Sequence, residues 1–214
     1  MDHTQARINM VKSQAVPNMV RDPALLAGMM RVPREEFVAP SHRELAYMDT
    51  PVPWNDAGRH SLTPLQAGWL IDALGVTNGK RVLVIGAGSG YEAALIGTMG
   101  AQVHALESDP ALAERGAALT DRERVTWKVG PLADGWPEGE KFDAILLCGA
   151  VPAIPYHLLG QLRPDGVLAG IVGNADDVAM NAKRIHGGSF RQEPLFDTMA
   201  PLLPGFETGE AFRL

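Results

Sequence analysis

The chain has 214 residues, of which 46% are hydrophobic and 21% charged, with a formal net charge of -6 and an isoelectric point near 5.5. This acidic balance argues against a protein that binds nucleic acid by neutralising phosphates, and no apolar stretch reaches the roughly 18 to 20 residues of a membrane span. The length favours one domain, and the lone Cys148 provides neither a disulfide framework nor a cysteine-based metal site. Because the N-terminal stretch is polar and carries acidic residues, we expect a cytoplasmic protein without a nucleic-acid or membrane partner.

The first third of the sequence predicts helices. Residues 22–31 begin with Asp22 as an N-cap followed by a proline. Residues 63–74 repeat this arrangement, with Thr63 as the cap of a Thr-x-x-Gln capping box. Both segments therefore have well-defined helix starts.

One face of the second predicted helix carries Leu65, Trp69 and Ala73, and we expect this face to be buried. The segment between the two helices, residues 46–61, is rich in proline and polar residues. Irregular segments of this kind often carry binding sites.

Short apolar runs alternate with helix-like segments from Lys80 onward. The runs cover 81–86, 102–107, 124–129, 142–147 and 166–172, and the segments 109–120 and 155–164 suit helices. This alternation predicts a doubly wound, mainly parallel α/β sheet with the N-terminal helices packed over one end. Near the C-terminus, two more strands joined at Gly187-Gly188 predict an antiparallel hairpin at the sheet edge.

The first apolar run ends in a glycine-rich turn, GAGSG (86–90), after which a helix begins. Glycines at such a turn let backbone N–H groups approach a ligand. Because Tyr91 stands where a dinucleotide fingerprint needs its third glycine, the spacing favours a nucleoside-type ligand with a carboxylate and an amine. Glu107, at the end of the next run, can accept hydrogen bonds from both hydroxyls of a ribose. A tight turn without a ligand and a solvated strand end are the alternatives.

The stretch VLVIGAGSGYEAALI (82–96) resembles the first motif of class I S-adenosylmethionine-dependent methyltransferases, and specifically the protein-L-isoaspartate O-methyltransferase family. The resemblance continues in order and spacing through VPREEFVAP (32–40), AYMDTPVP (46–53) and VHALESDPALAE (103–114). It implies a single Rossmann-like domain over residues 1–214, with a seven-stranded sheet. It also implies S-adenosylmethionine as cofactor and methyl transfer to isoaspartyl carboxylates of damaged proteins or peptides.

The resemblance also assigns parts of the chain to the cofactor. Residues 1–79 would form a helical cap with the substrate-side segment, and residues 80–214 the cofactor-binding core. The cofactor-binding residues that it implies are Gly86, Ala87, Gly88, Ser89 and Gly90 around the methionine end, Glu107 and Ser108 at the ribose, and Leu132 near the adenine. The hydrogen-bonding role of Glu107 predicts that Glu107→Ala weakens cofactor binding by about 1 to 3 kcal/mol.

Two departures from the family pattern concern the cofactor. Val84 stands where the family usually has an acid, and Pro131-Leu132 follow Gly130 where Gly-Asp-Gly is common. Since the cofactor bears a positive sulfonium and an ammonium, loss of the acid predicts weaker binding. Val84→Glu is expected to tighten binding if the new carboxylate reaches the ligand, and to destabilise the fold if it is stranded in the core.

A third departure lies on the substrate side, where Leu62 occupies the position of the family's serine. Ser61 could supply the hydroxyl if the backbone shifts by one residue, whereas Thr63 is better explained as an N-cap. Arg59 could hold a substrate carboxylate through a bidentate contact or could face solvent. His60 is a polar neighbour, and no metal-ligand spacing surrounds it.

Three functions follow from these observations. The first is isoaspartyl methyl transfer, the second is methyl transfer to a different acceptor, and the third is non-catalytic binding of a partner or nucleoside. Methylating a carboxylate requires mainly alignment and exclusion of water, so neither a catalytic triad nor a metal is needed. Binding of S-adenosylmethionine and S-adenosylhomocysteine separates the third function from the other two.

Overall fold

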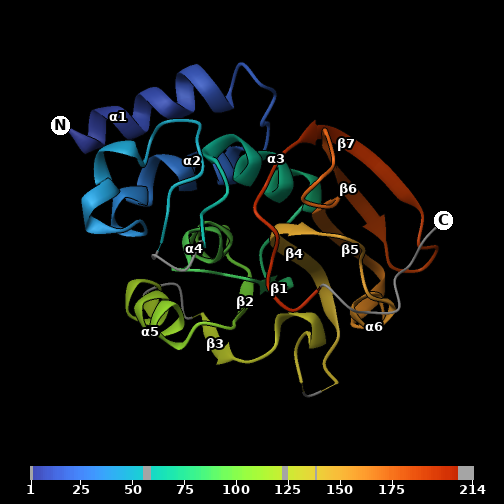
Figure 1. Ribbon diagram of the computed structural model, residues 1–214. Coiled ribbons are helices and arrows are strands. Elements are labelled where there is room, and N and C mark those ends of the chain that lie inside the picture. The colour runs from blue at the N-terminus through green and yellow to red at the C-terminus, as the bar shows by residue number, and fades with distance from the viewer. Residues whose placement is uncertain (1, 55–58, 122–124, 138, 207–214) are drawn as a thin grey trace.

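The computed structural model describes residues 2–54, 59–121, 125–137 and 139–206, which surround one seven-stranded sheet (Figure 1). The strand order is β3-β2-β1-β4-β5-β6-β7. The strands are β1 (Arg81–Ile85), β2 (Gln102–Glu107), β3 (Thr126–Val129), β4 (Phe142–Val151), β5 (Leu162–Val172), β6 (Met180–His186) and β7 (Gln192–Thr198). The strand order reverses between β1 and β4, which places the carboxyl end of β1 at a switch point, where α/β folds bind ligands.

The pairing confirms a mainly parallel sheet with an antiparallel edge. Strands β3, β2, β1, β4 and β5 pair in parallel, whereas β6 runs antiparallel to both β5 and β7. The predicted hairpin is present as β6 and β7. The central strands are buried on both faces, so their sequences are nearly continuous apolar runs.

The helices begin where the sequence predicts caps. The helical elements are α1 (His3–Met10), η1 (Val11–Ala15), α2 (Pro23–Arg31), η2 (Arg34–Glu36), η3 (Pro40–Leu45), α3 (Pro64–Leu74), α4 (Tyr91–Thr98), α5 (Pro110–Leu119), η5 (Leu132–Asp134) and α6 (Tyr156–Leu159). The side chain of Asp22 accepts hydrogen bonds from two N–H groups of α2, and Asp109 does the same for α5. Thr63 and Gln66 form the predicted capping box of α3.

Two hydrophobic layers enclose the sheet. One layer contains α3 and α4 together with β-strand residues such as Val84 and Leu146. The opposite layer contains α6, η5 and the C-terminal residues Leu203 and Phe206. The N-terminal helices therefore cover a face of the sheet rather than only its end: α3 lies on β4 and β5, and α2 lies on α4 (Figure 1).

Two local predictions were wrong. The helix predicted over 155–164 is only the four-residue α6, because Gly160 follows it and β5 already starts at Leu162. On α3, the predicted face is buried only at Leu65, since Trp69 and Ala73 are partly exposed; Leu70, Ile71 and Leu74 are buried instead. Trp69 instead packs on Phe196 of β7, with ring centroids 4.4 Å apart.

Among the described residues, no helix is both long and apolar enough to cross a membrane.

Candidate functional site

The glycine turn joins β1 to α4 at the carboxyl edge of the sheet. Gly86, Gly88 and Gly90 have φ angles of 71°, 57° and 95°, the left-handed region that favours glycine. Gly90 is the N-cap of α4. The turn is fully buried, so its backbone is shaped by tertiary packing as well as by the glycines.

Glu107 is completely buried at the end of β2, and its carboxylate connects the turn to the next loop. One oxygen, Oε2, accepts the backbone N–H of Gly88 at 2.7 Å. The other oxygen, Oε1, accepts the N–H groups of Ser108 at 2.8 Å and Asp109 at 3.0 Å, and the Ser108 hydroxyl at 3.2 Å. These contacts fix the orientation of the carboxylate between the glycine turn and the loop after β2.

Arg59 occupies the remaining side of the Glu107 carboxylate. Its Nη1 and Nη2 donate to Oε1 at 2.6 Å and Oε2 at 2.9 Å, a bidentate ion pair with the arginine side chain 12% exposed. The sequence predicted a bidentate contact of Arg59 with a substrate carboxylate; the structure places the arginine on the chain's own carboxylate. Arg59 therefore holds the acceptor positions that a ribose diol would use.

Trp54 lies against the glycine turn beside Arg59. A short antiparallel ladder aligns the two residues, since the N–H of Trp54 donates to the carbonyl of Arg59 at 2.9 Å and Pro53 pairs with His60. The guanidinium carbon of Arg59 lies 5.6 Å from the centre of the Trp54 ring. Residues 55–58 of the predicted irregular segment lie outside the described part of the chain.

Gly88→Ala is expected to destabilise the fold more than an ordinary substitution at a left-handed glycine. A Cβ at Gly88 would come within 2.1 Å of Cη2 of Trp54, so the indole must move in addition to the backbone strain. Gly79→Ala is the matched control, since Gly79 has φ of 79° and nothing within 4 Å of an added Cβ. Urea unfolding should give a loss of about 1 to 2 kcal/mol for the control and a clearly larger loss for Gly88→Ala. Equal losses would contradict the packing of Trp54 on this turn.

The substrate-side segment is held by a buried arginine, Arg34 of η2. Its Nη2 donates to Oγ of Ser61 at 3.1 Å and to the carbonyl of Leu62 at 2.6 Å, and its Nε donates to the carbonyl of Ala46 at 2.8 Å. The N–H of Val52 also donates to Oγ of Ser61, at 3.1 Å. Two donors thus occupy the lone pairs of the Ser61 hydroxyl, which leaves its O–H as the group it can offer to a substrate.

The other substrate-side residues serve α3 or the core. Oγ1 of Thr63 accepts the N–H of Gln66 at 3.2 Å, which is the N-cap role that the sequence favours. Leu62 is buried and contributes an apolar side chain to the core layer of α3. Ser61, Thr63 and Arg59 thus lie in one segment, but each already has a contact that shapes the fold.

Further residues predicted for the cofactor gather around the turn. Ala87 and Ser89 are buried, and the Ser89 hydroxyl donates to the carbonyl of Phe37. Leu132 of η5 lies beside Gly86, with Cδ1 3.5 Å from an added Cβ. Pro131, directly before it, is the N-cap residue of η5, and its side chain makes no capping hydrogen bond.

Val84 is fully buried between Ala105 of β2 and Leu146 of β4. A carboxylate introduced there would lie in the core layer of the sheet, the condition under which Val84→Glu costs stability.

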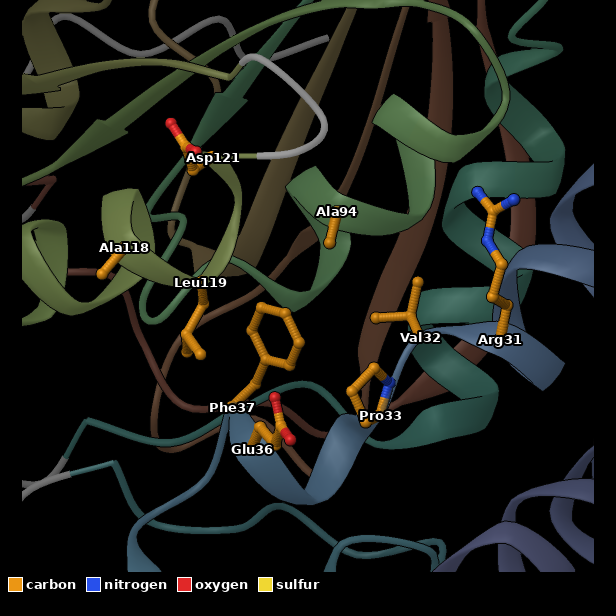
Figure 2. Close-up of a pocket in the computed structure, with 9 residues that line it drawn as sticks. All are labelled: Arg31, Val32, Pro33, Glu36, Phe37, Ala94, Ala118, Leu119 and Asp121. Atoms are coloured by element: carbon orange, nitrogen blue, oxygen red, sulfur yellow. The ribbon is translucent and has the colours of Figure 1, made fainter.

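The hollow in Figure 2 lies away from the glycine turn. It has a volume of about 750 Å³, lies between η2 and helices α4 and α5, and is lined by Arg31, Val32, Pro33, Glu36, Phe37, Ala94, Ala118, Leu119 and Asp121. The ring of Phe37 points toward Ala94 and Leu119 across this hollow (Figure 2). Because neither Glu107 nor the turn contributes to its lining, the hollow is separate from the predicted cofactor site.

Comparison with known proteins decides the family. A profile of the family described as protein-L-isoaspartate(D-aspartate) O-methyltransferase matches residues 5–200. The chain is a member of this family. It is 41% identical over 174 residues to the protein-L-isoaspartate O-methyltransferase of Methylorubrum extorquens, a match covering 80% of this chain and 76% of the relative. The protein-L-isoaspartate O-methyltransferase of Gloeobacter violaceus is 37% identical over 201 residues, a match covering 90% of this chain and 96% of the relative.

Solved structures agree with the isoaspartyl methyltransferase fold. A Plasmodium falciparum protein described as a protein-L-isoaspartate O-methyltransferase, in complex with S-adenosyl-L-homocysteine, superposes with a TM-score of 0.76 at 20% identity. The match covers 96% of this chain and 99% of that protein. Another structure of a protein-L-isoaspartate O-methyltransferase gives a TM-score of 0.79 at 20% identity, covering 95% of this chain and 67% of that one. The sequence prediction of a methyltransferase fold is confirmed.

Several residues around the candidate site were missed from the sequence. Trp54 packs against Gly88, and Arg34 lies over the ring of Tyr91, directly after the turn; both contacts are made only in the folded chain. Tyr91 and Glu92 directly follow the turn, and an acid so close to the missing acid at Val84 was a signal that the sequence offered.

Proposed function

We propose that the protein is an S-adenosylmethionine-dependent methyltransferase that acts on isoaspartyl carboxylates of proteins or peptides. The observation that carries this proposal is the glycine turn facing the buried Glu107, in a chain whose family and fold are those of isoaspartyl methyltransferases. The residues present fit the cofactor, since the turn has the backbone conformation of a glycine cradle and the acid at the end of β2 is oriented by the Gly88 N–H. When bound, S-adenosylmethionine supplies an electrophilic methyl group on a sulfonium.

The chain's own residues have positioning roles in this proposal. Glu107 holds the ribose, which requires Arg59 to leave its present place or to share the carboxylate. Ser61 offers its O–H to the substrate, and Arg34 fixes that hydroxyl through its own contact. An isoaspartyl carboxylate is already an anion at neutral pH, so alignment and exclusion of water are the main tasks of the site.

Arg59 can also provide a positive charge for the substrate carboxylate that accepts the methyl group. In this proposal, Arg59 leaves Glu107 in the loaded enzyme and pairs with the substrate carboxylate, which is the role the sequence suggested. Arg59 thus serves as the substrate-side cation in the loaded enzyme. We propose a cytoplasmic location, which the free and buried Cys148 is consistent with, since disulfides are rare in that compartment.

The test combines binding with turnover. The protein is titrated calorimetrically with S-adenosylhomocysteine and then incubated with S-adenosylmethionine and a peptide containing one isoaspartyl residue. We expect methyl ester formation on this peptide and none on the same peptide with a normal aspartyl residue. Binding without methylation of the isoaspartyl peptide would favour a different acceptor. Absence of binding would favour the non-catalytic function. The Arg59–Glu107 ion pair is the observation that supports this alternative, because it occupies the carboxylate that would hold the ribose.

A further inference from the structure

A cluster of buried polar atoms lies where α4 leaves the glycine turn. Both carboxylate oxygens of Glu92, the hydroxyl of Tyr91 and Nη1 of Arg34 are buried without a hydrogen bond of ordinary geometry. Glu92 and Tyr91 are 0% and 1% exposed, and Arg34 is 1% exposed. Buried polar atoms are nearly always paired, so a group of four such atoms indicates a place for a ligand or for water.

The cluster is a connected unit. The guanidinium carbon of Arg34 lies 4.6 Å from the centre of the Tyr91 ring, and Arg34 also acts electrostatically on Glu92. Burial raises the pKa of the Tyr91 hydroxyl to about 12, so this group stays a neutral donor. Because Arg34 already donates to Ser61 and Leu62, the cluster reaches from the glycine turn to the substrate-side segment.

Both Glu92 and Glu107 act electrostatically on the thiol of Cys148. This buried residue lies on β4 two positions beyond Leu146, the partner of Val84, and on the same core layer. Burial raises the pKa of its thiol, and the charges of both Glu92 and Glu107 raise it further. The charges of both carboxylates thus act on one buried thiol of the core layer that also contains Val84.

Resting on the proposed function, we infer that Glu92 binds the ammonium group at the methionine end of the cofactor, in place of the acid that Val84 lacks. The glycine turn holds that end of the ligand, and Glu92 is in the first turn of the helix that the glycines start. Within the described ranges, no hydrogen-bond donor contacts its carboxylate oxygens, and an ammonium supplies three donors. A negative charge at a helix N-terminus is also stabilised by the helix dipole.

Because Glu92 is buried, replacing its carboxylate should keep or raise the stability of the fold while it weakens cofactor binding. Burial raises the pKa of the Glu92 carboxyl, and Arg34 only partly opposes this. The folded chain then holds this proton at a pH where the unfolded chain has released it, so stability falls as the pH rises from the unfolded pKa toward the raised one. At neutral pH, Glu92→Gln removes this cost, and its melting temperature should be equal to or above that of the wild type.

The test compares two ligands that differ only in the amino-acid part. The wild type and Glu92→Gln are titrated with S-adenosylhomocysteine, which carries the ammonium, and with 5′-methylthioadenosine, which lacks the whole amino-acid group. We expect Glu92→Gln to bind S-adenosylhomocysteine about tenfold more weakly, the effect of losing a hydrogen bond to a charged group. Binding of 5′-methylthioadenosine should be unchanged. The matched control is Glu114→Gln, the same change at an exposed position of α5, which should leave both affinities unchanged.

Each outcome separates the inference from the proposed function. If the wild type binds both ligands and Glu92→Gln binds S-adenosylhomocysteine equally well, the inference is wrong and the proposed function stands, and the cluster holds water. Equal weakening for both ligands would also overturn the inference, because it would mean that Glu92 shapes the turn rather than binding the ammonium. If the wild type binds neither ligand, the proposed function fails and this inference fails with it.

Discussion

Arg34→Met is expected to lower the free energy of unfolding by about 3 to 5 kcal/mol. The arginine is 1% exposed and donates to the carbonyls of Ala46 and Leu62 and to the hydroxyl of Ser61. A methionine fills much of the same volume, so the loss reports the three lost hydrogen bonds rather than a cavity; the carbonyls of Ala46 and Leu62 lose the Arg34 donor, whereas Ser61 keeps the N–H of Val52. Equilibrium urea unfolding followed by circular dichroism measures it.

Arg31→Met is the control for this substitution, since Arg31 is exposed at the end of α2, three positions before Arg34. Its unfolding free energy should stay within about 0.5 kcal/mol of the wild type. A similar small effect for Arg34→Met would mean that water replaces the guanidinium among these acceptors, and that Arg34 does not fix the substrate-side segment.

Glu107→Gln is expected to weaken S-adenosylhomocysteine binding by about tenfold to a hundredfold. An amide has one oxygen, whereas both oxygens of Glu107 accept hydrogen bonds, from Arg59 and from the N–H groups of Gly88, Ser108 and Asp109. The amide NH2 must therefore face a donor, which displaces either the turn or the arginine. Because this also costs stability, by about 3 kcal/mol, the titration is made well below the melting temperature of the variant.

Arg59→Gln should shift the affinity in the opposite direction. The bidentate contact of Arg59 competes with the ribose for Glu107, so its removal should tighten S-adenosylhomocysteine about three- to tenfold while lowering the melting temperature. Weaker binding in this variant would show that Arg59 and the ribose share the carboxylate, and the competition described for the site would be wrong.

Much of the architecture followed from local sequence. Short apolar runs with helices between them predicted the parallel strands, because a strand that is buried on both faces consists almost entirely of apolar residues. Asp22 and Thr63 predicted their helix starts because capping uses atoms within three residues of the cap. The glycine spacing and the acid at the end of β2 predicted the cofactor edge for the same reason, since each property belongs to one short segment.

Predictions failed where distant segments compete for the same side chain. The apolar spacing of α3 predicted Leu65, Trp69 and Ala73 as its buried face, but only Leu65 is buried in the helix that packs on β4 and β5. Trp69 is left to pack on β7, more than a hundred residues later in the sequence. Periodicity identifies an apolar stripe, and only packing decides which side of a mostly apolar helix is covered.

The sequence by itself determined the family, the α/β sheet and the residues of the glycine turn, because these depend on local order and spacing. Only the tertiary structure brought Arg59 onto Glu107, Trp54 onto Gly88 and Arg34 over the ring of Tyr91. Each of these contacts joins an arginine or aromatic side chain of the N-terminal segment to the edge of a sheet formed much later in the chain. An arginine or aromatic side chain can contact many kinds of group, and the position of the N-terminal segment over the sheet decides which group each one contacts.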